Sequence, residues 1–307
     1  MKSINLKTGN LFSSLWKGLN DSQFQDSVDL FFKRAKANNF NLDLIKNKNI
    51  LDAGCGSGRY SVAMHYAGAK NIKAIDISDK GINRAKKILK SYKNIDFMQD
   101  NVQKLSFKNN TFDFVWSAGV IHHTNNYELC ISEFKRVLKK NGYLFLLTYG
   151  GGGLRWQLIK SLRPILRTLD QKLIFNSMKN INLPENNIKH FMDDFYVPIQ
   201  TLIPFKDLKK SLLQNNFSKI DRWEGNTFDH ESDFKSQKKD MIKIKKIINS
   251  TYQLSNKNDK YLINLMLKIC NDYLNTFRKV ELSKLNFKEK KKIIIGEGNH
   301  RVICQKN

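Results

Sequence analysis

A short glycine-rich loop constrains this chain more than any other feature. Residues 49 to 51 favour a short buried strand, and glycines follow at positions 54, 56 and 58. A helical pattern begins at Tyr60, so a strand, a glycine-rich turn and a helix start follow one another. A turn of this kind lets a ligand approach the backbone closely, because glycine has no side chain to block it.

The spacing of the glycines indicates which ligand the loop suits. It is G-x-G-x-G, whereas dinucleotide-binding folds use G-x-G-x-x-G to aim helix N–H groups at a pyrophosphate. Asp52, two residues before the first glycine, would repel a pyrophosphate and attract a cationic amine. The same glycines also occur in ordinary turns. As a ligand site, the loop favours S-adenosylmethionine (SAM), which carries an ammonium and a sulfonium group and no phosphate.

Acidic residues end the next two predicted strands. Asp76 ends a strand at 72–76, roughly eighteen residues after Gly58, and Asp100 follows in a strand at 95–101. A fourth strand at 112–117 leads to a helix at 127–138, and Lys139 to Gly142 are typical of a helix stop before a fifth strand at 143–148. The carboxyl ends of parallel strands meet at one edge of a sheet, so these acids should point into one crevice.

Taken together, these segments resemble the class I SAM-dependent methyltransferases, in particular the type 11 methyltransferase-domain group. The resemblance is close over residues 45–150 and loose over 200–223. It implies an α/β fold with a Rossmann-like, seven-stranded, mostly parallel sheet, an antiparallel last strand, helices on both faces and helical inserts. It also implies SAM as the cofactor. It rests on five motifs in the family's order: D-A-G-C-G-S-G-R-Y, A-I-D-I-S, Q-D-N-V, F-D-F-V-W-S-A-G-V-I-H-H and L-K-K-N-G-Y-L.

The resemblance also implies roles for particular residues. Asp52 and the glycine loop would hold the methionine end of SAM, Asp76 would take both ribose hydroxyls, and Asp100 would accept from the adenine amino group. Asn101 and Val102 would lie beside the adenine ring. The complete set of implied cofactor-binding residues is Asp52, Gly54, Cys55, Gly56, Gly58, Asp76, Ile77, Asp100, Asn101, Val102, Ser117, Ala118 and Gly119, the last three lining the path to the reactive methyl group.

The rest of the chain predicts additions to this core. Four glycines at 150–153 indicate a flexible hinge into a segment that forms either a lid over the substrate site or a packed helical hairpin. Phe12 and Trp16, in the first segment, are expected above the SAM site. The predicted parts are an N-terminal helical segment at 1–45, the SAM-binding core at 46–150, a helical insert or lid at 151–204, the continued core at 205–229, a lysine-rich helical insert at 230–290, and the final strand at 291–307.

The net charge of +25 invites a nucleic-acid or membrane partner. Lys far outnumbers Arg, however, and Asn and Ile are abundant too, so compositional drift is the main expected cause and specific nucleic-acid binding is not expected. The positive electrostatic field of the chain still favours an anionic substrate. No apolar run reaches the 18 to 20 residues of a transmembrane helix, and the start of the chain has no signal-peptide pattern. Four scattered cysteines fit reduced thiols in a cytoplasmic protein without a metal site, namely Cys55, Cys130, Cys270 and Cys304.

Two histidines are the candidate catalytic residues. His122 and His123 follow the fourth strand, where an imidazole could take a proton from the acceptor near neutral pH. A structural role in the loop is the alternative for one or both. We expect His122 to face the methyl-transfer path and His123 to serve the loop. Tyr149 and Tyr196 are weaker candidates.

Methyl transfer from a sulfonium needs mainly alignment and the exclusion of water, so the sequence leaves the acceptor open. The N/D/S-P-P-Y/F motif of base amino methylation is absent after the fourth strand, where Ser117 to Val120 stand. The prediction is therefore methylation of a small-molecule, sugar or lipid-linked acceptor, at O or N rather than C. The alternatives are an RNA or protein methyltransferase that uses the basic inserts, and a non-catalytic scaffold with the SAM fold.

Overall fold

The computed structural model describes residues 7–8, 21–223 and 233–307. The chain divides into two compact units. Unit 1 comprises Met1–Tyr149, Pro198–Asn226 and Asn299–Asn307, and unit 2 comprises Gly150–Val197 and Thr227–Gly298. The two helical segments that the sequence analysis treated as separate inserts therefore form one unit, and residues 198–204 belong to unit 1. Phe12 and Trp16 lie outside the described residues.

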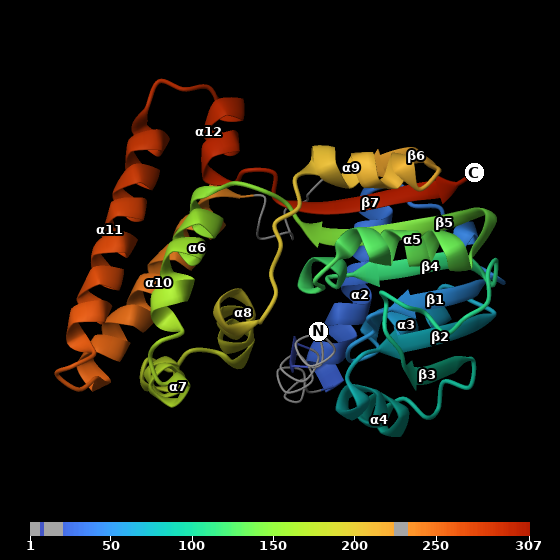
Figure 1. Ribbon diagram of the computed structural model, residues 1–307, viewed down its shortest axis with the longest axis horizontal. Helices are drawn as coiled ribbons and strands as arrows, with labels where there is room; N and C mark the ends of the chain where they lie inside the picture. The colour runs from blue at the N-terminus through green and yellow to red at the C-terminus, as the bar shows by residue number, and fades with distance from the viewer. Residues whose placement is uncertain (1–6, 9–20, 224–232) are drawn as a thin grey trace. The chain divides into compact units, whose positions relative to one another are not determined.

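Unit 1 is built on a single seven-stranded sheet with the strand order β3-β2-β1-β4-β5-β7-β6 (Figure 1). The first five strands pair in parallel, and β7 runs antiparallel to both of its neighbours. The predicted fold class is confirmed. The strands are β1 (Asn49–Ala53), β2 (Asn71–Asp76), β3 (Ile95–Gln99), β4 (Phe112–Ala118), β5 (Leu138–Tyr149), β6 (Phe217–Arg222) and β7 (Asn299–Lys306).

Helices cover both faces of this sheet, as its sequence requires. Ile50 and Leu51 on β1 are both fully buried, and they belong to two different hydrophobic clusters, one on each face. This is typical of a central parallel strand, which must be apolar on both sides. The cluster around Ile50 includes residues of α2 (Asp21–Ala37), α3 (Arg59–Tyr66) and α4 (Asp79–Ile88), and the cluster around Leu51 includes residues of α5 (Tyr127–Val137) and α9 (Phe205–Gln214).

The end of the chain differs from the prediction of a strand over 291–307. Residues up to Ile294 form a helix instead, and the strand begins only at Asn299. The isoleucine run at 293–295 favours a strand, but a capping box precedes it. The Asn286 side chain accepts from the Glu289 N–H, and the Glu289 carboxylate accepts from the Asn286 N–H. This reciprocal pair stabilises the start of a helix that extends through Ile293 and Ile294.

Unit 2 is entirely helical over its described residues. Within it, α10 packs against α7 and α11, and α11 packs against α6. Met241 and Ile247 of α10 and Met266 and Phe277 of α11 are fully buried, as their helical spacing predicts. The helices of the unit are α6 (Leu154–Leu166), α7 (Gln171–Asn180), α8 (Glu185–Tyr196), α10 (Phe234–Leu254), α11 (Lys260–Leu282) and α12 (Phe287–Ile294).

The glycine run at 150–153 has a different role from the free hinge that the sequence predicts. The Gly150 N–H donates to the Gly298 carbonyl at 2.8 Å, and the Glu297 N–H donates to the Gly151 carbonyl at 2.9 Å. A Cβ on Gly153 would lie 2.4 Å from the Ile295 carbonyl oxygen. The glycines thus allow two backbone segments of unit 2 to cross in contact, where a side chain at position 153 would clash.

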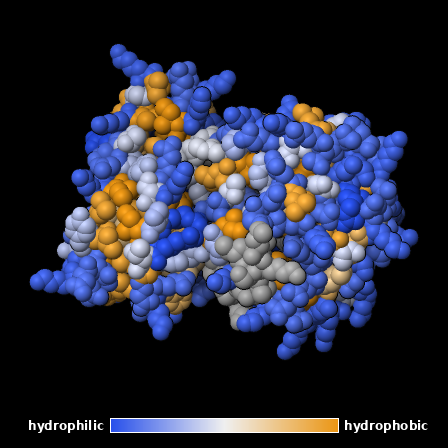
Figure 2. Space-filling view, viewed as in Figure 1, coloured by the Kyte–Doolittle hydropathy of each residue, from blue (hydrophilic) through white to orange (hydrophobic). Residues whose placement is uncertain are grey.

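The surface of the described residues is mostly hydrophilic, with apolar areas over unit 2 (Figure 2). On α10, Lys239 and Lys246 are exposed. Lys238 lies 2.7 Å from the Glu281 carboxylate. These lysines lie on a solvated face of the helix. None of the described helices is both long enough and apolar enough to span a bilayer.

Candidate active site

The glycine loop after β1 leaves an opening beside its backbone. Gly54, Gly56 and Gly58 all have positive φ, at 85°, 53° and 83°. A Cβ on Gly54 would lie 2.2 Å from Cγ2 of Val120, and one on Gly58 would lie 2.6 Å from Cδ1 of Leu89. A Cβ on Gly56 would meet nothing within 4 Å. Two of the glycines therefore serve packing, and the third borders open space that a ligand can enter.

Asp76 at the end of β2 is tied to this loop. Its carboxylate accepts from the Gly56 N–H at 3.0 Å and from the Ser78 N–H at 2.9 Å. Burial raises the pKa of Asp76, and these backbone donors oppose the shift. The N–H groups of Gly54 and Cys55 both donate to the Ile75 carbonyl at 2.8 Å. The loop is thus fixed to the end of β2, and the Asp76 carboxylate lies beside the open position at Gly56.

Asp52 is a buried carboxyl group under the same loop. Its side chain accepts from the Ser61 hydroxyl of α3 at 2.6 Å, and the residue is 1% exposed. Burial raises its pKa to about 7, and the nearby Asp76 adds to the shift while the Ser61 hydrogen bond opposes it. A carboxyl group that ionises near neutral pH can hold a cation that arrives with a ligand.

Asp100 follows β3 and shapes a turn. Its carboxylate accepts from the Ser106 N–H at 3.0 Å, from the Ser106 hydroxyl at 2.9 Å and from the Asn101 N–H at 2.8 Å. Oδ2 accepts both bonds from Ser106, whereas Oδ1 accepts only from Asn101 and has room for one further ligand donor. Val102 next to it is 8% exposed, and the Ile77 carbonyl accepts from the Gln99 side chain at 2.9 Å.

The segment after β4 has two different surroundings. The Ser117 hydroxyl is buried and donates to the Ala53 carbonyl at 3.1 Å, so it joins β4 to β1. Gly119 donates its N–H to the Leu147 carbonyl at 2.9 Å, and a Cβ on it would meet nothing within 4 Å. Ala118 stands between the two and is partly exposed. The open position of this segment is therefore at Gly119.

The two histidines lie in the short 3₁₀ helix η3 (Ile121–His123), and their surroundings differ. His122 is fully buried, and its ring centroid lies 4.0 Å from that of Tyr149 and 4.1 Å from that of His123. Over the described residues neither ring nitrogen of His122 has a hydrogen-bond partner. Burial and the neighbouring His123 lower its pKa well below the usual range, so it is a neutral imidazole at pH 7 and not the near-neutral group that the sequence suggested.

His123 is anchored to the segment that follows unit 2 in the chain. Its Nδ1 lies 2.9 Å from the Ile199 carbonyl, which only accepts, so Nδ1 carries the proton. The Thr201 N–H donates to the His122 carbonyl at 2.9 Å and strengthens the same junction. Tyr196, by contrast, is part of unit 2, and its hydroxyl reaches the Leu166 carbonyl at 3.5 Å.

The residues gathered here fit SAM in the chemistry of their groups. Asp100 directly follows β3, Asp76 is the last residue of β2, and Asp52 is the last but one of β1; these strands are neighbours in the sheet. Carboxylates suit an amino group, a pair of hydroxyls and an ammonium, and the open position at Gly56 admits a ligand against the backbone. Over the described part of the chain, no group of three or more His, Cys, Asp and Glu side chains is placed to hold a metal ion.

Comparisons with known proteins identify a methyltransferase domain in this chain. A family model described as a methyltransferase domain matches residues 51–146. A malonyl-[acyl-carrier protein] O-methyltransferase from Buchnera aphidicola is 28% identical over 184 residues, which cover 57% of this chain and 70% of the relative. A ubiquinone biosynthesis O-methyltransferase from Pelagibacter ubique is 36% identical over 105 residues, 34% of this chain and 43% of the relative. The chain thus spans less than half of this second relative.

A solved structure shares the fold. The YcgJ protein from Bacillus subtilis superposes with a TM-score of 0.53 at 15% identity, over 92% of this chain and 99% of that protein. At this identity the likeness concerns the fold alone. The matched domain model over residues 51–146 and the methyltransferase relatives, together with the seven-stranded sheet, support a class I SAM-dependent methyltransferase.

Proposed function

We propose that this protein transfers a methyl group from SAM to oxygen or nitrogen of a small-molecule, sugar or lipid-linked acceptor. The order of the site residues along the sheet carries the proposal. Asp100, Asp76 and the glycine loop follow β3, β2 and β1, and His122 follows β4, the next strand. A cofactor laid across the first three strands brings its reactive end to β4, where the acceptor would bind.

Each cofactor residue has a task in this arrangement. Asp100 accepts from the adenine amino group, with Asn101 and Val102 beside the ring, and Asp76 accepts from the ribose hydroxyls. Asp52, in its ionised form, pairs with the methionine ammonium. SAM, when bound, supplies a methyl group on a positively charged sulfur with a neutral leaving group. The chain then has to align the acceptor and keep water out.

The histidine pair divides the remaining work. His122 takes the acceptor's proton, because its ring stays neutral at pH 7 and both nitrogens lack partners over the described residues. His123 holds the Ile199 segment through its Nδ1 and so positions the wall of the site. The oxygen acceptors are supported by the relatives' names, which describe O-methyltransferases of a malonyl carrier protein and of ubiquinone biosynthesis.

A transfer assay tests this function. The purified chain is incubated with tritiated SAM and with separated small-molecule, lipid and RNA fractions of the source cell, and His122→Asn serves as the matched control. We expect label in a small-molecule or lipid fraction and its loss in the control. Label confined to RNA or protein would replace this proposal with a macromolecular acceptor. SAM binding without any transfer would point to a scaffold.

A further inference from the structure

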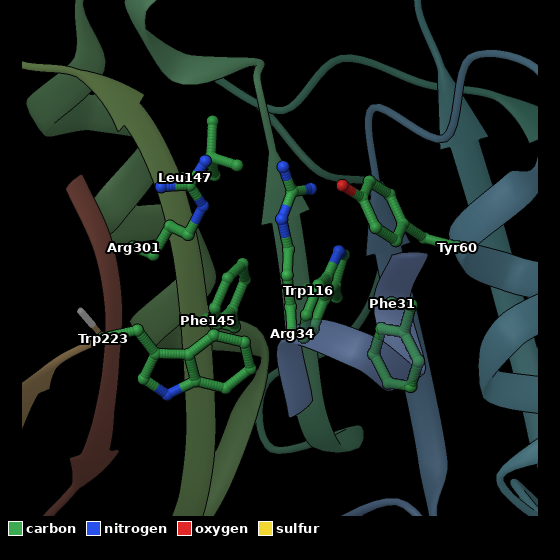
Figure 3. Close-up of a pocket in the computed structure, with 8 residues that line it drawn as sticks. All are labelled: Phe31, Arg34, Tyr60, Trp116, Phe145, Leu147, Trp223 and Arg301. Atoms are coloured by element: carbon green, nitrogen blue, oxygen red, sulfur yellow. The ribbon is translucent and has the colours of Figure 1, made fainter. Parts of the chain in front are cut away.

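The narrow cavity under α2 belongs to the site already described. It measures about 10 Å³, which is room for one water-sized group. Its lining includes Tyr60, two residues after Gly58. It also includes Trp116, which pairs with Asp52 in the sheet. Figure 3 shows the Arg34 side chain running past Trp116 toward the Tyr60 hydroxyl. A further binding surface lies elsewhere, in unit 2.

The turn between α11 and α12 exposes large apolar side chains. Leu282 is 73% exposed and Phe287 is 69% exposed, and Leu285 and Ile293 are exposed as well. Figure 2 shows apolar atoms at the end of unit 2 where Figure 1 draws this turn. Exposed apolar residues that stand singly are ordinary on a protein surface, whereas a cluster of them marks a surface that binds something.

Basic side chains surround these apolar groups. Residues 278–293, here called the basic tip, contain seven lysines and arginines but only two acids. Both acids already serve the fold. The Glu281 carboxylate lies 2.7 Å from Lys238 of α10, and the Glu289 carboxylate accepts from the Asn286 N–H. The exposed basic residues of the tip are Arg278, Lys279, Lys284, Lys288, Lys291 and Lys292.

The basic tip is held in place by the rest of unit 2. The Phe287 ring stacks on Phe234 of α10 at a centroid distance of 5.4 Å. Lys290 donates from its Nζ to the Glu281 carbonyl at 2.8 Å and so ties α12 to the end of α11. The apolar groups are therefore presented by a fixed turn, and a partner that binds them pays little for ordering it.

The combination of side chains indicates what covers the basic tip. A protein–protein interface is depleted of Lys and needs roughly 20 to 30 residues from each partner, so a few apolar residues among lysines do not suit one. A nucleic acid would contact the lysines through its phosphates and leave the leucines in water. An anionic bilayer uses both groups, since its surface attracts lysines and its headgroup boundary accepts Leu and Phe side chains.

From these observations we infer that the basic tip docks the protein on an anionic membrane surface. Leu282, Leu285 and Phe287 enter the headgroup boundary, and the lysines lie over the charged headgroups. Firm anchoring at a membrane takes two signals, so the apolar groups and the lysines are both needed. The docking surface goes beyond the proposed methyl transfer and does not depend on it.

Vesicle co-sedimentation of the full chain tests this surface. Vesicles of phosphatidylcholine are compared with vesicles in which roughly 30% of the lipid is phosphatidylglycerol, and the anionic vesicles should bind at least about tenfold more tightly. Leu282→Ser combined with Phe287→Ser should weaken this binding about tenfold or more, because less apolar area leaves water. Lys284→Gln combined with Lys288→Gln should have an effect of similar size.

Matched variants at the other end of α11 control for charge and for apolar area. Because α11 has 23 residues, Tyr261 near its start lies roughly 30 Å from Leu282 at its end. Tyr261→Ser combined with Leu254→Ser removes two exposed apolar groups, and Lys257→Gln combined with Lys268→Gln removes two exposed charges. Salt screens charges at this distance from the membrane, so both controls should bind anionic vesicles within about twofold of wild type.

Tryptophan fluorescence measures insertion directly. Leu282→Trp should add emission that anionic vesicles with brominated acyl chains quench, whereas Tyr261→Trp should add emission that they leave unchanged. If the double serine variant of the tip fails to fold, the lysine pair and this quenching still decide the matter.

Four results would overturn the docking surface. Binding that falls equally in the tip variants and in their controls would assign it to net charge alone. Emission of Leu282→Trp that brominated lipid does not quench would exclude insertion. A dimer that Leu282→Ser dissociates in sedimentation velocity would make the tip an interface between two copies of the chain. RNA binding that needs Lys284 and Lys288, without any binding to vesicles, would assign the tip to nucleic acid.

Discussion

The buried carboxyl group of Asp52 should make cofactor affinity depend on pH. Its pKa in the free protein is about 7 because burial disfavours the charged form. The methionine ammonium pairs with the ionised form only, so binding has to draw on the ionised fraction. Lowering the pH below 7 protonates Asp52 and should lower the affinity for SAM, whereas the ammonium itself stays charged throughout this range.

The size of the effect follows from the ionised fraction. With a pKa of about 7, about 3% of the free protein carries a charged Asp52 at pH 5.5 and about 50% at pH 7. Affinity for S-adenosylhomocysteine, which has the same amino-acid end, should therefore rise about 15-fold between these two pH values. Binding at pH 6 should also release close to one proton per site.

Titration calorimetry in buffers of different ionisation enthalpy measures both quantities. Asp52→Asn is the control, because its amide oxygen can still accept from Ser61 and has no charge to titrate. Ionising Asp52 in the folded protein costs stability as pH rises from about 4 toward 7, so the variant should be no less stable than wild type at pH 7. The pH dependence of 5′-methylthioadenosine binding is measured as well. This compound keeps the ribose that faces Asp76 and lacks the ammonium that pairs with Asp52, so its affinity should not change with the ionisation of Asp52.

An affinity for S-adenosylhomocysteine that is flat between pH 5.5 and 7 would refute the reasoning. So would an equal pH dependence in Asp52→Asn, which would assign the titration to Asp76 at the ribose. A dependence shared by 5′-methylthioadenosine would lead to the same conclusion.

Four further predictions concern the loop, the histidines, unit 2 and the surface charge. Gly54→Ala should lower the free energy of unfolding by about 2–4 kcal/mol, because its Cβ would overlap Val120. Gly56→Ala should lower it by only about 1 kcal/mol and should chiefly weaken the binding of S-adenosylhomocysteine. Denaturant titration measures the first effect and calorimetry the second. His122→Asn should cut turnover roughly 10² to 10⁴-fold at unchanged cofactor affinity, and the wild-type rate should show no acid limb near neutral pH. His123→Ala should instead lower the free energy of unfolding by about 1 kcal/mol. Equal, modest losses of turnover in both variants would exclude either histidine as the base. Gly153→Ala, whose Cβ would overlap the Ile295 carbonyl, should destabilise unit 2 in a denaturant titration and reduce turnover at unchanged cofactor affinity; a parallel loss of cofactor affinity would refute the lid. RNA binding measured by filter retention should be weak, blind to sequence and absent at about 0.3 M salt; retention at that salt would favour an RNA acceptor.

The position of the three acids at the carboxyl ends of their strands could be predicted because its signals are local; their roles toward SAM stay predictions. A short parallel strand that ends in an acid places this acid at one edge of the sheet, whatever the rest of the chain does. Asp52 and Asp76 stand at the last but one and the last position of their strands, and Asp100 directly follows its strand. β1 is buried on both faces, as a strand in the middle of a parallel sheet must be, whereas β3 and β6 at the two edges carry exposed residues.

What escaped prediction depends on contacts between distant segments. His122 looks like an ordinary histidine in the sequence, and only its burial against Tyr149 shows that its pKa is lowered. The helix at Phe287–Ile294 was missed for a local reason, because the Asn286 and Glu289 cap outweighs an isoleucine run that favours a strand.

The place of β7 has a consequence for how the chain reaches its native state. It lies between β5 and β6, yet it is made after all of α10 to α12. A ribosome therefore releases β6 and more than seventy further residues before the strand that pairs with β6 exists. Until then the open edge of β5 and the unpaired β6 are exposed to other chains, and closing so long a loop slows the last pairing. Slowing synthesis, or deleting the eight residues of β7, should thus raise aggregation. The increase should exceed that from deleting an edge strand of similar length, because β7 has a neighbour on both sides.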